Sequence, residues 1–518
     1  MDPAFERIPA EIWLDIFELF PTAIDLYGIS VTCRKFRHLT IRALHRDVVW
    51  HKAKHAALEL KVWGDLPGME PYVRSLVLGV TRLPAGHRAR LVELDGTSIA
   101  GGVLHDSGDP SAGGPISDRP ANIVDSSFAA PSLHDALWAK IQTFTKISSL
   151  TFANMYVLPE HFELVHSLPL LRALRIDTCA ICSRSPHPAL NHATLPITDL
   201  TLYNIRRATR SLPNVPGGVD DLAYALSLAV AQNLRRLSID STADVFRSVF
   251  GVWDAPARGW AIPPNLEHLY VKKGVVAVVE RPSLFVVEHA FPDTHLYHFC
   301  VQAKSLRTVS TPIFVPAQVP IAPEALPAGL ERLCAPLDTV QLVAGVRPLQ
   351  AIGLLKCGVA AREGIMAMSS IGYSCPRLKM LLVELKGWDE EILSAAAQLF
   401  KCLRRLKVLY DGAGPSEDFL VSLAPEFLVN FPDLHTLQLY HQPPIGTKRP
   451  DYPTSLYDES FDTIEEELRN IIIPWNRYCP NLRLVQLHAG YVMTRAFEGA
   501  TWNLERVRRV EEIEELDY

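Results

Sequence analysis

The chain has 518 residues, of which 48% are hydrophobic and 21% charged, and its formal net charge at pH 7 is -6. This length allows more than one domain or one long array of repeats. The small negative charge argues against general nucleic-acid binding, and no stretch of about 18 uninterrupted apolar residues predicts a membrane span. We therefore expect neither a nucleic acid nor a membrane as a partner.

The opening MDPAFERIPAEIW has neither a basic leader nor an apolar signal region. The nine cysteines are an odd number, scattered from Cys33 to Cys479 and mostly set among apolar residues. Such cysteines are typical of reduced, buried thiols and not of a disulfide framework. Both features predict a cytoplasmic or nuclear protein, or one found in both places.

The first fifty residues have the spacing of short helices. Apolar residues recur at helical intervals over residues 10–20, and Pro21 ends that pattern. A second helical pattern begins at Leu26, and a third runs from Phe36 to Leu44 with a basic opposite face. A unit of roughly 45 residues seldom stabilises itself, so we expect another protein to cover part of its apolar surface.

This segment resembles an F-box, the motif that binds substrate receptors to the adaptor subunit of SCF (Skp/cullin/F-box) ubiquitin ligases. The matching positions are Ile8, Pro9, Glu11, Ile12, Ile16, Phe17, Leu26, Ile29, Cys33, Arg34 and Phe36, with Trp50 just after the motif. The resemblance implies a Skp-family adaptor, and through it a cullin, as partners. It also implies the adaptor-binding residues Ile8, Pro9, Ile12, Ile16, Phe17, Leu26, Ile29 and Phe36. The alternative is a helical cap on the domain that follows, with its apolar stripes buried internally.

A second pattern begins at Val73 and continues almost to the end of the sequence. It consists of an aliphatic residue, two variable residues, an aliphatic one, one variable and an aliphatic one, as in LRRLKV at Leu403. Copies start at Val73, Ile147, Leu171, Ile197, Leu234, Leu266, Leu330, Leu349, Leu378, Leu403, Leu434 and Leu482. Several follow a similar preface, such as CPR, FPD or CPN. This is an internal repeat.

Alternating aliphatic residues predict a short strand with one buried face, and stretches such as DEEILSAAAQLF predict helices between the strands. The fold class is therefore α/β: a short three-helix F-box followed by an irregular leucine-rich-repeat-like solenoid of short parallel strands and helices. The predicted divisions are 1–50 for the F-box, 51–146 for a linker and first repeat, and 147–518 for the solenoid. An ordinary parallel α/β domain is the alternative, although it would not explain the recurring preface.

Two segments do not follow the repeat. Residues 97–132 are rich in Gly, Ser, Asp and Pro, and residues 442–460 contain PPIGTKRPDYPTS. Both compositions predict loop insertions.

The sequence offers one candidate metal site. Cys179, Cys182, His187 and His192 have a spacing close to that of a zinc knuckle. The glycines that let a knuckle fold tightly are missing between them, so we favour cysteines packed at a strand end and histidines on a loop, and we expect no metal or cofactor. Phosphate-binding, dinucleotide-binding and hydrolase motifs are also missing, so we expect a protein that is not an enzyme.

The F-box resemblance together with the repeats predicts a substrate-recognition subunit, with the repeat domain binding a protein whose identity is unknown. The variable positions of the strands point away from the buried aliphatic residues and are candidate substrate contacts. They are Tyr203, Arg236, Tyr270, Lys272, Arg405, Lys407, Tyr440 and His488. The alternatives are a scaffold that binds the adaptor without directing ubiquitination, or a zinc protein built on the cluster from Cys179 to His192.

Overall fold

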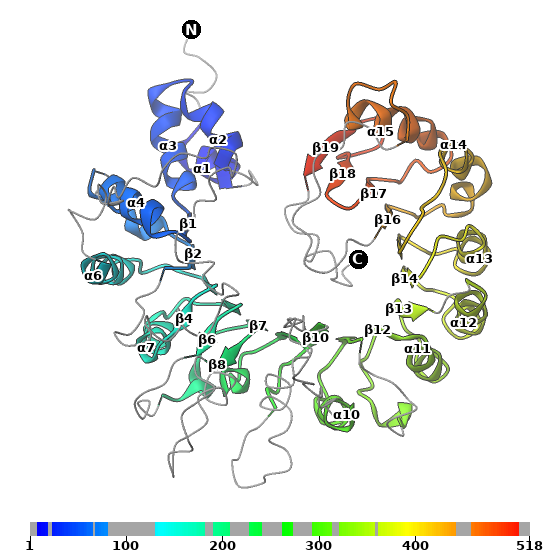
Figure 1. Ribbon diagram of the computed structural model, residues 1–518, viewed down its shortest axis with the longest axis horizontal. Coiled ribbons are helices and arrows are strands. Elements are labelled where there is room, and N and C mark those ends of the chain that lie inside the picture. The colour runs from blue at the N-terminus through cyan, green and yellow to red at the C-terminus, as the bar shows by residue number, and fades with distance from the viewer. Residues whose placement is uncertain are drawn as a thin grey trace, which may run out of the picture. The chain divides into compact units, whose positions relative to one another are not determined.

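The computed structural model describes residues 8–18, 23–65, 68–80, 130–181, 190–207, 227–240, 262–272, 293–312, 321–357, 361–441 and 457–506. Its contacts divide the chain into two compact units, Met1–Leu234 and Arg235–Tyr518. Each unit contains parallel strands joined by helices or loops, as the sequence repeat predicts (Figure 1).

The first unit begins with three short helices and continues into a parallel sheet. Its helices are α1 (Ala10–Glu18), α2 (Ala23–Ser30), α3 (Arg34–Leu44), α4 (Ala53–Asp65), α6 (Ala130–Ile141) and α7 (Pro159–Ser167), with the 3-10 turns η2 (Glu70–Tyr72), η3 (His192–Thr194) and η4 (Ser227–Val230). The main sheet has the strands β1 (Asp47–Trp50), β2 (Ser75–Leu78), β3 (Ser149–Ala153), β5 (Ala173–Asp177) and β7 (Asp199–Tyr203), paired in that order. A smaller parallel sheet contains β4 (Tyr156–Val157), β6 (Ala180–Ile181) and β8 (Arg206–Arg207).

The second unit has one longer sheet with helices between its strands. Its helices are α10 (Asp293–Gln302), α11 (Leu337–Ala344), α12 (Ala361–Ser374), α13 (Glu391–Leu399), α14 (Glu417–Glu426) and α15 (Ile464–Ile472), with η7 (Pro323–Ala325), η8 (Leu428–Asn430) and η9 (Ile473–Arg477). The strands are β9 (Arg236–Asp240), β10 (His268–Lys272), β11 (Thr308–Ser310), β12 (Arg332–Pro336), β13 (Ala351–Cys357), β14 (Met380–Leu385), β15 (Arg405–Tyr410), β16 (Thr436–His441), β17 (Leu484–His488), β18 (Tyr491–Thr494) and β19 (Asn503–Arg506). The pairs from β9 to β17 are parallel, whereas β18 and β19 continue the sheet in antiparallel pairs.

The recurring preface forms the turn that returns the chain from a helix to the next strand. The backbone N–H groups of Leu378 and Leu482 donate to the carbonyl oxygens of Cys375 and Cys479, three residues earlier, at 3.2 Å each. Both cysteines are buried, and so is Phe431, which occupies the same place before Leu434. The prefaces CPR, FPD and CPN are therefore structural turns.

A regular set of backbone hydrogen bonds keeps neighbouring strands in register. The carbonyl oxygen of Lys379 accepts the N–H groups of both Arg404 and Arg405, at 2.7 and 3.0 Å. One repeat later, the carbonyl oxygen of Arg404 accepts in the same way from His435 and Thr436. The strand phrases therefore pair as parallel neighbours, and the prediction of an α/β leucine-rich-repeat-like solenoid is confirmed.

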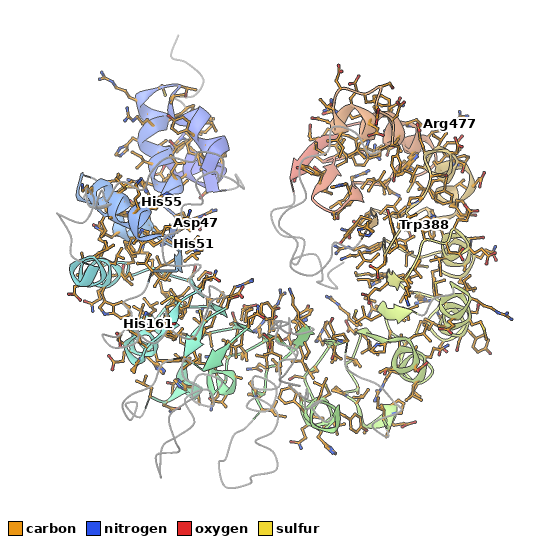
Figure 2. All side chains as sticks on the ribbon, viewed as in Figure 1. Asp47, His51, His55, His161, Trp388 and Arg477 are labelled. Carbon is orange, nitrogen blue, oxygen red and sulfur yellow. The ribbon has the colours of Figure 1, made fainter. Side chains whose placement is uncertain are left out.

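Aromatic side chains join the helices to the strands that they cover. Trp388, labelled in Figure 2, packs edge-on against Tyr410 of β15 and Phe419 of α14, and the ring centroids are 5.3 and 5.5 Å apart. In the first unit, His161 of α7 lies against Phe152 of β3, with centroids 5.4 Å apart. Within the described ranges, none of the helices combines the length and apolar character that a membrane span requires.

The predicted F-box segment and the two predicted insertions can be compared with the elements of the structure. The parallel sheet begins at Asp47, so the last residues of the predicted F-box segment, 47–50, form its first strand, paired with β2. Residues 97–129 of the first predicted insertion lie outside the described residues, and its last three begin α6. Of the second, residues 442–456 lie outside the described part of the chain as well.

Candidate functional site

The three N-terminal helices form a small bundle around aromatic side chains. Trp13, Phe17 and Phe36 contact one another, with ring centroids 4.8 to 5.8 Å apart. Phe17 is 2% exposed and Leu26 is 3% exposed, and both pack with Leu39 in the centre of the bundle. The resemblance implied an adaptor contact for Phe17 and Leu26, but their burial places them in the core, where they hold the bundle together.

The other implied adaptor contacts are more accessible. Ile12 is 48% exposed and Pro9 is exposed, while Ile8, Ile16 and Ile29 are half-buried. Phe36 is also half-buried, at the edge of the aromatic core. The side chains that face solvent most therefore lie on α1 and the residues just before it.

Two further apolar side chains are exposed on the bundle, and the sequence interpretation did not include them. Tyr27 of α2 is 66% exposed, and Val31, directly after that helix, is 68% exposed. They are four residues apart, a spacing that places side chains on the same side of a helix. Large apolar residues at that spacing, next to the positions of the buried Leu26 and Ser30, were the signal that could have identified them.

Cys33 and the turn around it set the position of the third helix. The Cys33 sulfur accepts a hydrogen bond from the Phe36 N–H at 3.4 Å and so caps the N-terminus of α3. The hydroxyls of Ser30 and Thr32 donate to the Tyr27 and Ile29 carbonyl oxygens, both at 2.7 Å. Cys33 is therefore a helix cap, because its sulfur accepts a hydrogen bond from an N–H group that the helix itself leaves unpaired.

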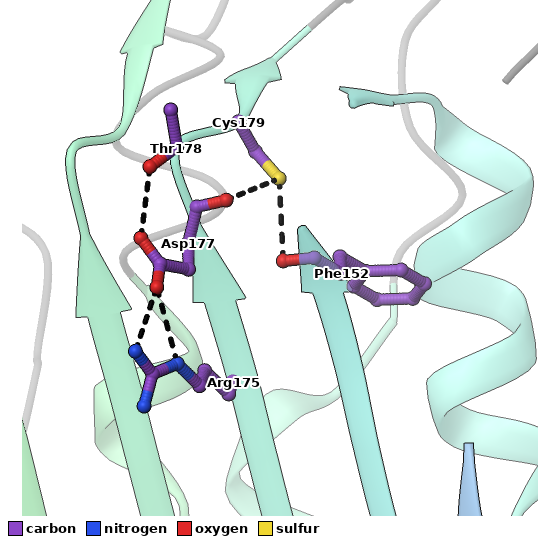
Figure 3. A network of polar contacts seen from close by, with 5 residues as sticks. All are labelled: Phe152, Arg175, Asp177, Thr178 and Cys179. Atoms are coloured by element: carbon purple, nitrogen blue, oxygen red, sulfur yellow. Dashed lines mark hydrogen bonds and ion pairs between the residues drawn. The ribbon is translucent and has the colours of Figure 1, made fainter. Parts of the chain in front are cut away.

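One predicted substrate contact, Tyr203 of β7, lies in the first unit beside a group of polar side chains on β5. Arg175 and Asp177 of β5 form an ion pair at 2.7 Å, and Thr178 donates to the other Asp177 oxygen (Figure 3). The guanidinium of Arg175 also lies 5.4 Å from the centre of the Tyr203 ring. Tyr203 itself is only 9% exposed, so the predicted contact is mostly covered.

The candidates at the start of the second unit also lie close together. The Arg236 guanidinium is 5.8 Å from the centre of the Tyr270 ring, and Tyr270 is 6% exposed. Lys272, at the end of β10, which also contains Tyr270, is half-buried. Arg236 and Lys272 are thus the more accessible members of this group.

The remaining candidates form a polar row across β15, β16 and β17. Arg405 donates to the side-chain oxygen of Gln438 at 3.3 Å, and Gln438 donates to Gln486 at 2.7 Å. The Lys407 ammonium lies 5.7 Å from the centre of the Tyr440 ring. The sequence interpretation missed Gln438 and Gln486, although they occupy the same strand positions as the chosen residues.

The middle of this row is buried and Arg405 and His488 are half-buried, whereas the sequence predicted an exposed binding surface. Lys407 is 1% exposed and Tyr440 is 2% exposed, and burial lowers the pKa of the half-buried His488. The side chains point away from the buried aliphatic residues as predicted, yet they are shielded from solvent. The alternation of residues along a strand therefore indicates which side chains share a face, but it does not indicate whether solvent reaches that face.

The structure tests part of the candidate zinc site. The Cys179 thiol donates to the carbonyl oxygens of Phe152 and Asp177 at 3.4 and 3.3 Å, and burial raises its pKa to about 12 (Figure 3). His192 is buried, with Nδ1 3.0 Å from Nε2 of His166. Cys182 and His187 lie outside the described residues. A zinc ligand must be a thiolate, so the hydrogen bonds of Cys179 fit a structural cysteine better.

Comparisons with known proteins give fold-level similarity alone. No family model matches the chain, and no curated protein matches it. Similar solved structures include an internalin (inlF) from Listeria monocytogenes, with 14% identity and a TM-score of 0.26 over 58% of this chain and 77% of that one. The TLR13–ssRNA13 complex has 14% identity and a TM-score of 0.24, over 58% of this chain and 44% of that one.

A third similar structure is the leucine-rich-repeat ectodomain of the receptor kinase GASSHO1/SCHENGEN3 from Arabidopsis thaliana, in complex with CASPARIAN STRIP INTEGRITY FACTOR 2. It has 11% identity and a TM-score of 0.23, and the match covers 58% of this chain and 34% of that one. The chain thus spans less than half the length of the latter two proteins. Its own strand order and turns, and not these low scores, establish the repeat fold.

Proposed function

We propose that this chain is the substrate-recognition subunit of an SCF-type ubiquitin ligase. In this proposal the bundle of α1, α2 and α3 binds a Skp-family adaptor and, through it, a cullin. The repeat strands bind a protein substrate. Such a subunit makes and breaks no covalent bond; it raises the local concentration of substrate lysines near the conjugating enzyme.

The observation that carries the proposal is the exposed apolar surface of the bundle. Ile12, Tyr27 and Val31 are between 48% and 68% exposed, while the aromatic core beneath them is closed. Covering an exposed side chain of this size contributes about 1.5 to 3 kcal/mol, so a partner that covers all three would bind well without any charged contact. The resemblance to an F-box suggests that this partner is a Skp-family adaptor.

The exposed residues also suggest a sharper test than the buried ones. Replacing Phe17 or Leu26 would unfold the bundle, whereas Ile12→Asp and Val31→Asp change the surface alone. In a pull-down that probes for the Skp-family adaptor and the cullin, we expect each variant to lose both by about tenfold or more, because a charge would be buried against apolar groups. Leu58→Asp on α4, where Leu58 is 54% exposed, is the matched control and should bind like the wild type.

Thermal unfolding of each variant shows whether the bundle is intact. If the folded wild-type chain brings down neither the adaptor nor the cullin, the proposal fails. If the adaptor appears without the cullin, the chain is an adaptor-bound scaffold. If Ile12→Asp and Val31→Asp bind as well as Leu58→Asp, the bundle surface that we describe is not the docking surface.

A further inference from the structure

The N-terminal bundle meets the first repeat where two side chains from the end of α3 lie against aromatic rings. The His45 ring contacts Trp63 of α4, with ring centroids 5.2 Å apart and the rings inclined at 63°. The Arg42 guanidinium lies 4.7 Å from the centre of the Tyr72 ring in η2. We call these four residues the junction, and all of them belong to the first unit.

The backbone holds His45 at the point where the bundle passes into the sheet. Its N–H donates to the Ile41 carbonyl oxygen at 3.1 Å, and the next N–H, of Arg46, donates to that of Ala43 at 3.3 Å. Strand β1 begins at Asp47, directly after these two residues. The His45 side chain is half-buried, so its contact with Trp63 helps to fix the end of the bundle.

Trp63 joins this end of the bundle to three other elements. Its side chain is 3% exposed, and its ring centroid is 5.3 Å from that of Phe144, which follows α6. The Lys140 ammonium of α6 lies 5.2 Å from the centre of the same indole ring and forms a 2.6 Å ion pair with Glu70 of η2. A loss of the contact between His45 and Trp63 therefore loosens the bundle from α4, α6 and η2 together.

His45 is the junction residue whose charge can change near neutral pH. Burial lowers the pKa of His45 from its ordinary value of 6.5, because the half-buried ring is less well solvated when charged. Opening the junction returns the pKa to its ordinary value, so the open form binds more protons. The closed junction therefore loses stability as the pH falls below 6.5, and it loses no more once the pH is below the lowered pKa.

The charged groups around His45 do not reverse this effect. Those on α3, β1, η2 and the last turns of α4 and α6 are Arg42, Arg46, Asp47, Glu59, Lys61, Glu70 and Lys140. Each of the three carboxylates already accepts a hydrogen bond, from Arg46, Trp50 or Lys140, at 3.4, 2.7 and 2.6 Å. The C-terminal end of a helix favours a cation, but two arginines already supply positive charge there.

We propose that the junction is a pH-sensitive joint, in which protonation of His45 weakens its contact with Trp63 and lets the bundle move against the first repeat. The imidazolium would share one indole ring with the Lys140 ammonium. Both lie 5.2 Å from the centre of that ring, so they are within about 10 Å of each other, where salt screens their repulsion only in part.

This inference does not depend on adaptor binding, because it concerns contacts within the first unit alone. If the proposed function also holds, the joint has a consequence for it. The junction then determines how firmly the first repeats are held against the adaptor-binding bundle, and mildly acidic conditions reduce that rigidity.

Oxidation of Trp63 by hydroxyl radicals, followed by mass spectrometry of the full chain without a partner, tests the proposal. We expect the Trp63 oxidation rate to rise about threefold to tenfold between pH 7.5 and pH 5.5, about tenfold being the limit that one pH unit below the ordinary pKa allows. Trp50, which is fully buried in β1 of the same unit, is the internal reference and should stay protected at both pH values.

Substitutions at position 45 separate this effect from general acid sensitivity. His45→Gln removes the titrating group, and His45→Phe also keeps an aromatic ring against Trp63, so in both variants the oxidation of Trp63 should not depend on pH. The matched control is His38→Gln, because His38 is exposed on the same helix, and this variant should respond to pH like the wild type. If the Gln variant is oxidised at both pH values because it packs loosely, the Phe variant decides.

The titration of His45 itself is measured by hydrogen exchange at its ring carbon, with a midpoint expected below 6.5. A midpoint at or above 6.5 would overturn the proposal. So would a pH response of Trp63 that persists in His45→Phe. An equal rise in the oxidation of Trp50 would overturn it as well, since the whole unit and not the junction would then be opening.

Discussion

At the scale of single residues, the cysteines show how much of the chemistry of this chain is structural. Cys33 caps α3, Cys375 and Cys479 close the turns before their strands, and Cys179 donates to two backbone carbonyl groups. Burial raises the pKa of the Cys179 and Cys479 thiols to about 12 and about 11. These thiols are thus kept in the neutral form, which is neither nucleophilic nor metal-binding.

A first prediction follows for Cys179. Because a thiol with a pKa of about 12 is a thiolate only about once in ten thousand molecules at pH 8, iodoacetamide should modify Cys179 far more slowly than the exposed Cys402. Labelling of the native chain at pH 8, followed by peptide mass spectrometry, measures both rates. Comparable rates would mean that Cys179 is ionised, and would return the zinc interpretation to consideration.

At the scale of elements, the first unit contains a recurring turn after its strands. Asn154, Thr178 and Asn204 follow β3, β5 and β7 directly, and all three have positive φ angles of 51° to 56°. The N–H of Asn154 donates to the Asp177 carbonyl oxygen, and the N–H of Thr178 donates to that of Tyr203. Asparagine tolerates this left-handed conformation, whereas a β-branched threonine is strained in it.

This turn leads to a prediction of increased stability. Thr178→Asn should raise the free energy of unfolding by about 0.5 to 1 kcal/mol, because the asparagine relieves the strain that its counterparts in the neighbouring repeats avoid. Urea unfolding measures the change. The control is Thr151→Asn inside β3, where the backbone is extended and asparagine is disfavoured, and it should lower stability. A loss of stability at position 178 would show that the Thr178 hydroxyl bond to Asp177 outweighs the strain.

At the scale of the molecule, the helical bundle and the repeat sheet of the first unit are built as one structure. Strand β1 follows α3 after two residues, and the Arg46 carbonyl oxygen accepts the N–H groups of Arg74 and Ser75. Trp50 is fully buried, donates to Glu59 at 2.7 Å and packs against Phe144. The tryptophan that follows the motif is therefore a core residue of the first strand of the sheet.

This continuity predicts where the chain can be shortened. A chain that begins at Arg46 keeps β1 and should retain the first repeats, whereas one that begins at His51 loses Val48 and Trp50 and should be destabilised there by about 3 to 5 kcal/mol. Hydrogen exchange of the amides in β2 and β3 measures the difference. Equal protection of β2 in the two shortened chains would mean that β1 contributes little and that the predicted boundary at residue 50 is adequate.

The sequence by itself determined the repeat and hence the fold class. The aliphatic residues of each phrase must alternate to bury one strand face, so their period could be read without coordinates. The helices of the N-terminal bundle were also predicted, because apolar residues recur at helical spacing whatever lies around them. The alternation further identified side chains that point away from the buried aliphatic residues of the strands, such as Lys407 and Tyr440.

Only the tertiary structure decided which of those side chains can be reached. Phe17 and Ile12 are both apolar and both fit the motif, yet one lies in the core and the other faces solvent. Arg405 and Lys407 lie two residues apart on the same face of β15, yet Lys407 is shielded and Arg405 is only half-buried. The physical reason is that periodicity depends on neighbours along one element, whereas burial depends on every segment that packs against it, including segments far away in the sequence.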